Sequence, residues 1–163
     1  MRISLHSTST RTFVAMPALL LAEHVLRRAP VRPSGAPLLV AGFAAYRVAG
    51  WYRLPRAGGS AGMKGMPETL VTDGVYAWTR NPMYLGHMLF LTGLALTTRS
   101  PLAIAALAVH GPWFGRRVAA DEARLTAEFG EEYVAYLARV PRWIPRPPKS
   151  GAGAAFGPAG GGR

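Results

Sequence analysis

The feature that most constrains this chain is a junction between a polar, turn-rich segment and an apolar helix, within LVTDGVYAWTRNPMYLGHMLFLTGLAL, residues 70–96. The junction is Asn81-Pro82. Asn is a strong helix N-cap. Pro at the first helical position costs no hydrogen bond, because a backbone N–H at that position has no partner within the helix. The sequence therefore predicts a helix that runs from Pro82 to about Thr97.

The first turn of this helix is a candidate binding site. Its unpaired N–H groups and the positive end of the helix dipole lie next to Arg80 and within reach of Tyr76 and Tyr84. This arrangement suits a ligand that carries a carboxylate. The alternative interpretation is an ordinary, well-capped membrane helix with Trp78 and Tyr84 at the membrane interface.

One side of the same helix is expected to touch another helix closely. Gly86, Gly93 and Thr97 share that side, and small residues allow two helix backbones to approach. His87 lies one turn after Tyr84, and we interpret it as a packed histidine rather than a catalytic one.

Three further apolar runs cover residues 12–26, 37–52 and 101–114. A secretory signal is the alternative for the first run, but no small-residue cleavage pattern follows it. All three are shorter than the ~20 residues that span a bilayer comfortably, so we expect tilted or polar-extended helices. With the helix after Pro82, they predict an all-α integral membrane bundle of about four transmembrane helices. The mean hydropathy of +0.14 does not by itself indicate a membrane protein.

Two segments are expected to lack regular structure. Residues 53–67 are rich in Gly and Pro and have no helical period, so they are interpreted as a connecting loop. A phosphate-binding loop would need a preceding strand and a Lys-Ser/Thr ending, which this segment lacks. Residues 146–163 have almost nothing to bury and are predicted to form a disordered tail. The expected membrane domain therefore covers residues 1–145.

The net charge of +11 raises the question of a nucleic-acid partner. We expect none, because the charges are scattered between apolar segments instead of clustering on one face. If both termini are cytoplasmic, 14 of the 19 Lys and Arg residues lie on the cytoplasmic side. The positive-inside rule therefore favours a bundle in the inner membrane with both ends cytoplasmic. The absence of cysteine excludes disulfides and thiolate ligands, and no metal site is expected.

The last polar block follows the fourth apolar run. It predicts a helix to Phe129, a break at Gly130 and a short amphipathic helix that ends before Pro141. Glu122 falls on the apolar stripe of the first of these helices, where a carboxylate needs a partner. Asp121 instead shares a face with Arg117 and Arg124 at helical spacing, and an ordinary solvated salt-bridge face is the alternative to a functional role.

Two ordered blocks of this sequence resemble one known family. LVTDGVYAWTRNPMYLG is similar to the cofactor-binding signature of the isoprenylcysteine carboxyl methyltransferases, which are related to the phospholipid N-methyltransferases, and residues 117–141 match the same family. The resemblance covers about residues 68–145. It implies that S-adenosylmethionine is the cofactor and that Arg117 contacts the substrate. It further implies that the cofactor pocket is formed by Glu68, Thr69, Leu70, Val71, Tyr76, Asn81, Pro82, Met83, Tyr84, Asp121 and Glu122.

Two departures from the family pattern limit what can be transferred. Asn81 stands where eukaryotic members have His, and the first acid of the carboxylate pair is Asp121 rather than Glu. Asn can form hydrogen bonds but cannot carry a proton near neutral pH. The sequence thus predicts methyl transfer to a lipophilic acceptor, with a carboxylate preferred. N-methylation of a phospholipid head group and a non-catalytic membrane protein are the alternatives.

Overall fold

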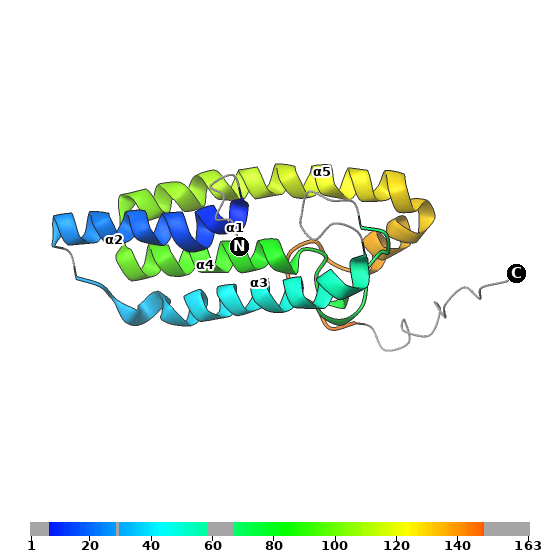
Figure 1. Ribbon diagram of the computed structural model, residues 1–163, viewed down its shortest axis with the longest axis horizontal. Coiled ribbons are helices and arrows are strands. Elements are labelled where there is room, and N and C mark those ends of the chain that lie inside the picture. Colours follow the sequence, from blue (N-terminus) through cyan, green and yellow to red (C-terminus); the bar gives the residue numbers. More distant parts are fainter. Residues whose placement is uncertain (1–6, 29, 59–66, 149–163) are drawn as a thin grey trace, which may run out of the picture.

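The regular structure of the chain is helical throughout the residues that the computed structural model describes, which are 7–28, 30–58 and 67–148. The predicted all-α class is confirmed. The first apolar run forms a continuous helix in three sections, α1 (Thr8–Thr10), the π-helical η1 (Arg11–Ala15) and α2 (Met16–Arg27). Figure 1 shows this helix beside α4 and α5, with α3 on the opposite side of α4.

Two antiparallel helices, α3 (Ala36–Ala57) and α4 (Pro82–Thr98), form the tightest pair in the bundle. The short η2 (Pro33–Gly35) precedes α3. A Cβ atom at Gly86 would lie 2.7 Å from the carbonyl oxygen of Gly42, and one at Gly93 would lie 2.9 Å from that of Gly35. Side chains at these positions would push the helices apart, so the predicted small-residue contact face is confirmed.

The second apolar run continues further than the sequence indicated. The expectation of a loop from residue 53 is wrong for its first part, because α3 extends to Ala57 with Pro55 inside it. Arg56 supports this last turn by donating to the carbonyl of Tyr52 (3.1 Å) and stacking over the Tyr52 ring (3.9 Å). Residues 59–66 of the expected loop lie outside the described residues, as does the predicted disordered tail from residue 149 onward.

The longest helix is α5 (Pro101–Arg139), which begins at a Ser100 cap whose hydroxyl accepts from the backbone N–H groups of Leu102 and Ala103. The fourth apolar run and the helix predicted after it form one continuous helix, because α5 passes through both. Phe114 and Val118 explain this continuity, since they are buried one turn apart on the same face. The predicted break at Gly130 is confirmed, with φ of 53° and ψ of −128°.

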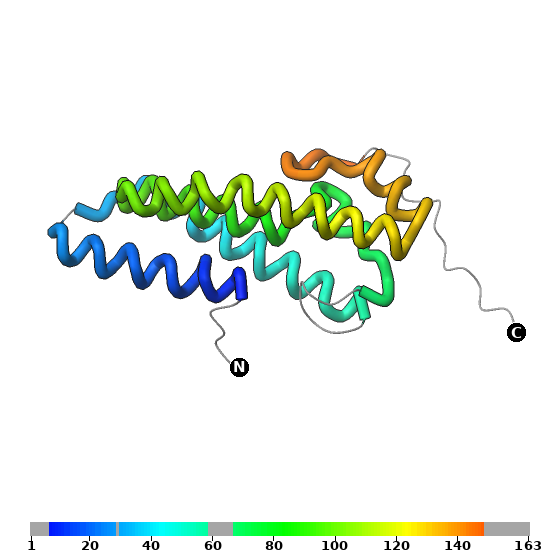
Figure 2. Tube along the Cα trace, turned by 90° about the horizontal axis from the view of Figure 1, so that it is seen from above, coloured from blue at the N-terminus to red at the C-terminus, as the bar shows by residue number. Residues whose placement is uncertain are grey.

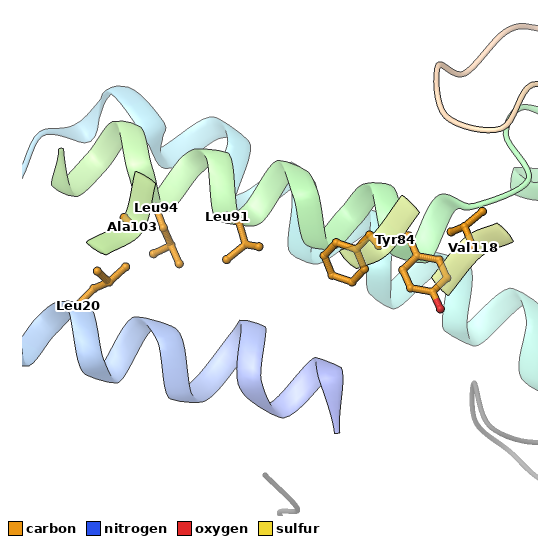
Figure 3. Packing of buried hydrophobic residues seen from close by; sticks show 7 residues of the cluster. Leu20, Tyr84, Leu91, Leu94, Ala103 and Val118 are labelled. Carbon is orange, nitrogen blue, oxygen red and sulfur yellow. The ribbon is translucent and has the colours of Figure 1, made fainter. Parts of the chain in front are cut away.

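Because α5 turns back at Gly130, its last part covers one end of the bundle (Figure 2). The main core, shown in Figure 3, consists of Leu20, Tyr84, Leu91, Leu94, Ala103, Phe114 and Val118. A second, smaller core lies after the turn, where Tyr133, Tyr136 and Val140 pack with Leu70, Leu125 and Phe129. This smaller core attaches the segment before α4 to the end of α5.

None of the helices in these described ranges combines the length with the apolar character that crossing a membrane requires.

Candidate functional site

A pocket opens at the end of the bundle where α4 begins. Its empty volume, including the part open to solvent, is about 760 Å³. The wall combines aromatic, aliphatic, acidic and basic side chains from both ordered blocks of the sequence. It consists of Arg53, Pro67, Thr69, Leu70, Val71, Tyr76, Arg80, Asn81, Pro82, Met83, Tyr84, Asp121, Arg124, Leu125, Tyr133 and Tyr136.

Most residues named from the sequence meet in this wall, but three do not. Glu68 lies at the end of α3, where its backbone N–H donates to the carbonyl of Ala57 (2.7 Å). Glu122 and Arg117 are also absent from the wall, and each has a different environment, described below.

The segment that precedes α4 is shaped by the short η3 (Gly74–Ala77). Gly74 has a φ of 53°, and Tyr52 of α3 packs so closely against it that any Cβ there would clash. The Tyr52 hydroxyl donates to Asp73 (2.7 Å), which ties the segment to α3. Buried Tyr76 is tied to α5 as well, because its carbonyl accepts from the hydroxyl of Tyr136 (2.7 Å).

Three tyrosine phenols on this side of the structure remain neutral over the physiological range. Burial raises the pKa of Tyr76 to about 12, and burial together with the nearby Glu122 carboxylate raises the pKa of Tyr133 to about 12. Burial also raises the pKa of Tyr136. These groups therefore act as hydrogen-bond donors and aromatic surfaces and not as bases.

Asn81 is at the N-cap position of α4, but its side chain does not cap the helix. The expectation of a side-chain cap is wrong, because Asn81 Nδ2 donates to the carbonyl of Arg142 (3.2 Å). The hydroxyl of the preceding Thr79 donates to the carbonyls of Arg142 and Trp143. The residues before α4 are thus hydrogen-bonded to the irregular segment after α5, and the Asn81 side chain leaves the first turn of α4 uncapped.

Arg80 is not free to bind an anionic ligand, contrary to the expectation from sequence. Its Nη1 donates to the carbonyls of Leu137 (2.7 Å) and Val140 (2.8 Å), and its Nε donates to Glu122 (3.1 Å). The backbone N–H of Arg80 also donates to the carbonyl of Pro141 (2.9 Å). Arg80 therefore joins the segment before α4 to the end of α5.

Glu122 finds the partner that its place on an apolar stripe requires. The residue is 7% exposed, and its carboxylate accepts from Arg80 at Oε1 and from Arg142 at Oε2 (2.5 Å). Both oxygens are therefore occupied by guanidinium groups, and the carboxylate links α5 to two other parts of the chain.

Asp121, one residue earlier, faces the pocket and begins a chain of polar contacts. Its carboxylate accepts from the hydroxyl of Tyr84 (2.8 Å) and from Arg124 (2.6 Å). The Tyr84 hydroxyl in turn accepts from Nε of Arg117 (3.0 Å). Since Tyr84 lines the pocket and Arg117 does not, the Tyr84 hydroxyl marks the boundary between the pocket and the arginine.

Sequence reasoning did not assign several wall residues to the site. Tyr133 and Tyr136 are three residues apart on one helix face, and this spacing was the available signal. Arg53 reaches the pocket from the end of α3, in a part of the chain interpreted as loop.

Taken together, the helical fold and the mixed polar and aromatic pocket define a protein that binds a small molecule where its two sequence blocks meet. The chain belongs to the phospholipid methyltransferase family, whose model matches residues 32–130. The protein-S-isoprenylcysteine O-methyltransferase of Mus musculus is 40% identical over 80 residues, which are 48% of this chain and 28% of that protein. Its namesake from Schizosaccharomyces pombe is 32% identical over 86 residues, 52% of this chain and 36% of the relative.

These alignments have a limited extent. The human protein of the same name is 38% identical over 79 residues, and the match covers only 28% of its length. The chain therefore spans well under half the length of the curated relatives it matches. No solved structure gives a significant match.

Proposed function

We propose that this protein is a membrane methyltransferase that transfers a methyl group from S-adenosylmethionine to a lipophilic acceptor, and that the acceptor is a carboxylate of the isoprenylcysteine type. The observation that carries the proposal is the shared pocket. Residues from both blocks that resemble the methyltransferases, such as Val71 and Asp121, line the same cavity although they are far apart in sequence.

The chemistry of the wall fits this cofactor. Adenine needs flat and apolar surfaces, which Tyr76, Tyr133 and Leu125 offer. The ribose hydroxyls and the amino and sulfonium groups favour a carboxylate, which Asp121 supplies. The cofactor's own carboxylate favours the first-turn N–H groups of α4 and the cationic Arg53. When bound, S-adenosylmethionine supplies an activated methyl group on a positively charged sulfur.

The protein's contribution to such a reaction is chiefly positional. A carboxylate acceptor is already a nucleophile, so the protein needs to orient it and to exclude water rather than to remove a proton. Arg117 can hold a carboxylate through two parallel hydrogen bonds, because the guanidinium group is a planar fork. Its contact with the Tyr84 hydroxyl places it directly beyond the wall of the pocket.

Exposed apolar side chains support a membrane location for the protein. The distribution of Lys and Arg along the sequence supports the further proposals that both termini are cytoplasmic and that residues 1–145 form the membrane domain. Large apolar residues are exposed on the N-terminal helix, on α3 and on α5, and such exposure is unfavourable in water. They include Leu21, Val25, Leu26, Val40, Phe43, Val48, Ile104 and Val109. A lipid environment would cover this surface.

The proposal is tested by comparing two aspartates that each accept a hydrogen bond from a tyrosine. Asp121 accepts from Tyr84 inside the pocket, whereas Asp73 accepts from Tyr52 outside it. In the purified protein, Asp121→Asn should weaken S-adenosylmethionine binding by about tenfold or more, since hydrogen bonds to charged groups contribute ~1.5–3 kcal/mol. Asp73→Asn should leave the calorimetric affinity unchanged. Equal affinities in both variants would remove the cofactor from this pocket.

The second candidate is N-methylation of phosphatidylethanolamine, favoured by the description of the family model that matches the chain. An amine acceptor must lose a proton, and Asp121 is the carboxylate of the wall that is able to accept one. Methyl transfer to phosphatidylethanolamine, with none to a prenylated cysteine, would establish this reaction. Cofactor binding without transfer to either acceptor would favour a non-catalytic protein that retains the fold.

A further inference from the structure

Two arginines from distant parts of the sequence approach the same tryptophan. The guanidinium carbon of Arg11, in η1, lies 5.4 Å from the ring centroid of Trp113, and that of Arg117, in α5, lies 5.7 Å from it. Each distance is within the range of a cation–π contact. Two guanidinium groups, one from the first helix and one from the last, therefore lie next to Trp113.

In the part of the chain that the structure describes, no side-chain carboxylate forms an ion pair with Arg11 or Arg117. All eight Asp and Glu residues of the chain lie within the described ranges, and their ion pairs there go to Arg27, Arg80, Arg124 and Arg142. Two guanidinium groups near one ring make the local electrostatic potential positive. The pair is therefore complementary to an anion that comes from outside the chain.

The turn that presents Arg11 is anchored firmly. Thr12 is buried, and the ring of Phe13 packs on His87 (4.8 Å) and Phe90 (4.8 Å) of α4. Arg11 itself is exposed. The five-residue π-helical section begins at this residue, and such local π-helical geometry is frequent at functional sites.

The arginine pair also lies next to the proposed reaction site. Trp113 packs against Phe114 (5.1 Å between ring centroids), and Phe114 packs against Tyr84 (5.3 Å). Tyr84 lines the cofactor pocket and accepts the hydrogen bond from Arg117. The pair is thus connected to the pocket wall through the Phe114 and Tyr84 rings and through the Arg117–Tyr84 hydrogen bond.

We propose that Arg11 and Arg117, both stacked on Trp113, together bind the oxyanion head group of the lipophilic acceptor. This inference rests on the proposed function and adds a binding residue, Arg11, outside the two blocks that resemble the methyltransferases. A carboxylate and a phosphodiester share the required chemistry. The two differ after reaction, because methylation neutralises a carboxylate and leaves a phosphodiester charged. A carboxylate product would therefore lose its attraction to the pair.

Binding of a prenylated cysteine and of its methyl ester to the purified protein, without cofactor, tests the proposal directly. The wild-type protein should prefer the acid. Arg11→Gln should weaken binding of the acid by about tenfold and leave the ester unchanged, because only the acid offers a charged hydrogen-bond acceptor. Arg47→Gln is the matched control, since Arg47 lies over Trp51 (5.0 Å) on another part of the surface. It should alter neither affinity.

Measuring the binding of phosphatidylethanolamine in the same way shows whether the bound oxyanion is a phosphodiester or a carboxylate. If Arg11→Gln weakens binding of this lipid and not that of the acid, the pair binds a phosphodiester. Equal changes for acid, ester and lipid, or the same changes in Arg47→Gln, would overturn the proposal. If Arg11→Gln does not fold, Arg11→Lys replaces it, and it should retain part of the acid preference while Arg47→Lys behaves as wild type. Loss of the preference in both lysine variants would also overturn the proposal.

The test of the arginine pair can fail or succeed independently of the proposed methyltransferase function. Calorimetry with S-adenosylmethionine on the same preparation measures cofactor binding independently of the acceptor. Acid-selective binding that depends on Arg11, without any cofactor binding, would reject the methyltransferase and retain the arginine pair. Cofactor binding and methyl transfer with an acid preference that is insensitive to Arg11→Gln would reject the pair and retain the enzyme.

Discussion

Substitution of Glu122 by Gln should destabilise the fold without acting on the cofactor directly. The ion pair between Arg80 and Glu122 has side chains that are each 10% exposed, and removing one partner of a buried pair costs about 3–5 kcal/mol. Arg80 keeps its two carbonyl acceptors, which reduces this cost. Arg142 is 45% exposed, so water can replace its contact at a cost of under about 1 kcal/mol. We expect a total loss of about 3 kcal/mol.

The assay is thermal unfolding of the purified protein, followed by tryptophan fluorescence. In a chain of 163 residues, a loss of about 3 kcal/mol corresponds to a fall in Tm of about 6–12 °C. Glu128→Gln is the control, because Glu128 is an exposed acid on the same helix, and its Tm should stay within about 2 °C of wild type. A Glu122→Gln variant with wild-type Tm and reduced cofactor affinity would refute this reasoning and make Glu122 a cofactor ligand, as the sequence resemblance implied.

The remaining predictions concern the substrate, the helix contact and pH. Arg117→Lys should keep cofactor affinity but lose most methyl transfer to a lipophilic carboxylate, measured on one preparation, because Lys lacks the planar fork. Gly86→Ala should lower the free energy of unfolding by about 1–3 kcal/mol, because its Cβ would lie 2.7 Å from backbone atoms of α3. Gly115→Ala is the control: its Cβ would meet open space, so the free energy of unfolding should rise by about 0.5–1 kcal/mol. Both are measured by thermal unfolding. Burial raises the pKa of Tyr76 and of Tyr133 from 10.0 to about 12. The stability that these neutral phenols contribute is therefore complete below pH 10 and lost towards pH 12, so Tm should fall between these two pH values.

Features that depend on local chemistry were predictable from the sequence. The start of α4 at Pro82 and the break at Gly130 follow from backbone preferences of single residues, and the structure has both. The close contact at Gly86 and Gly93 was also predictable, because small residues at helical spacing allow two helix backbones to approach closely.

Features that depend on distant partners were not predictable in the same way. The side chain of Asn81 is suited to capping, but a carbonyl 61 residues later, that of Arg142, lies close enough to take its amide donor. Likewise, the stripe pattern shows that Glu122 needs a partner, but nothing local identifies Arg80 and Arg142. Family resemblance grouped Asp121 with Glu122, whereas adjacent residues on a helix point about 100° apart and so face different surroundings.

The bonds that join residues 78–81 to residues 137–146 also fix an order of events during synthesis. The carbonyl of Trp78 accepts from the backbone N–H of Arg146, and Arg80 is held by carbonyls of Leu137 and Val140. A ribosome adds these partners some sixty residues after the segment they hold, which is several seconds of translation at usual rates. Until then the start of α4 lacks its permanent neighbours. A nascent chain therefore contains α2, α3 and α4 before the residues that hold the start of α4 have been made.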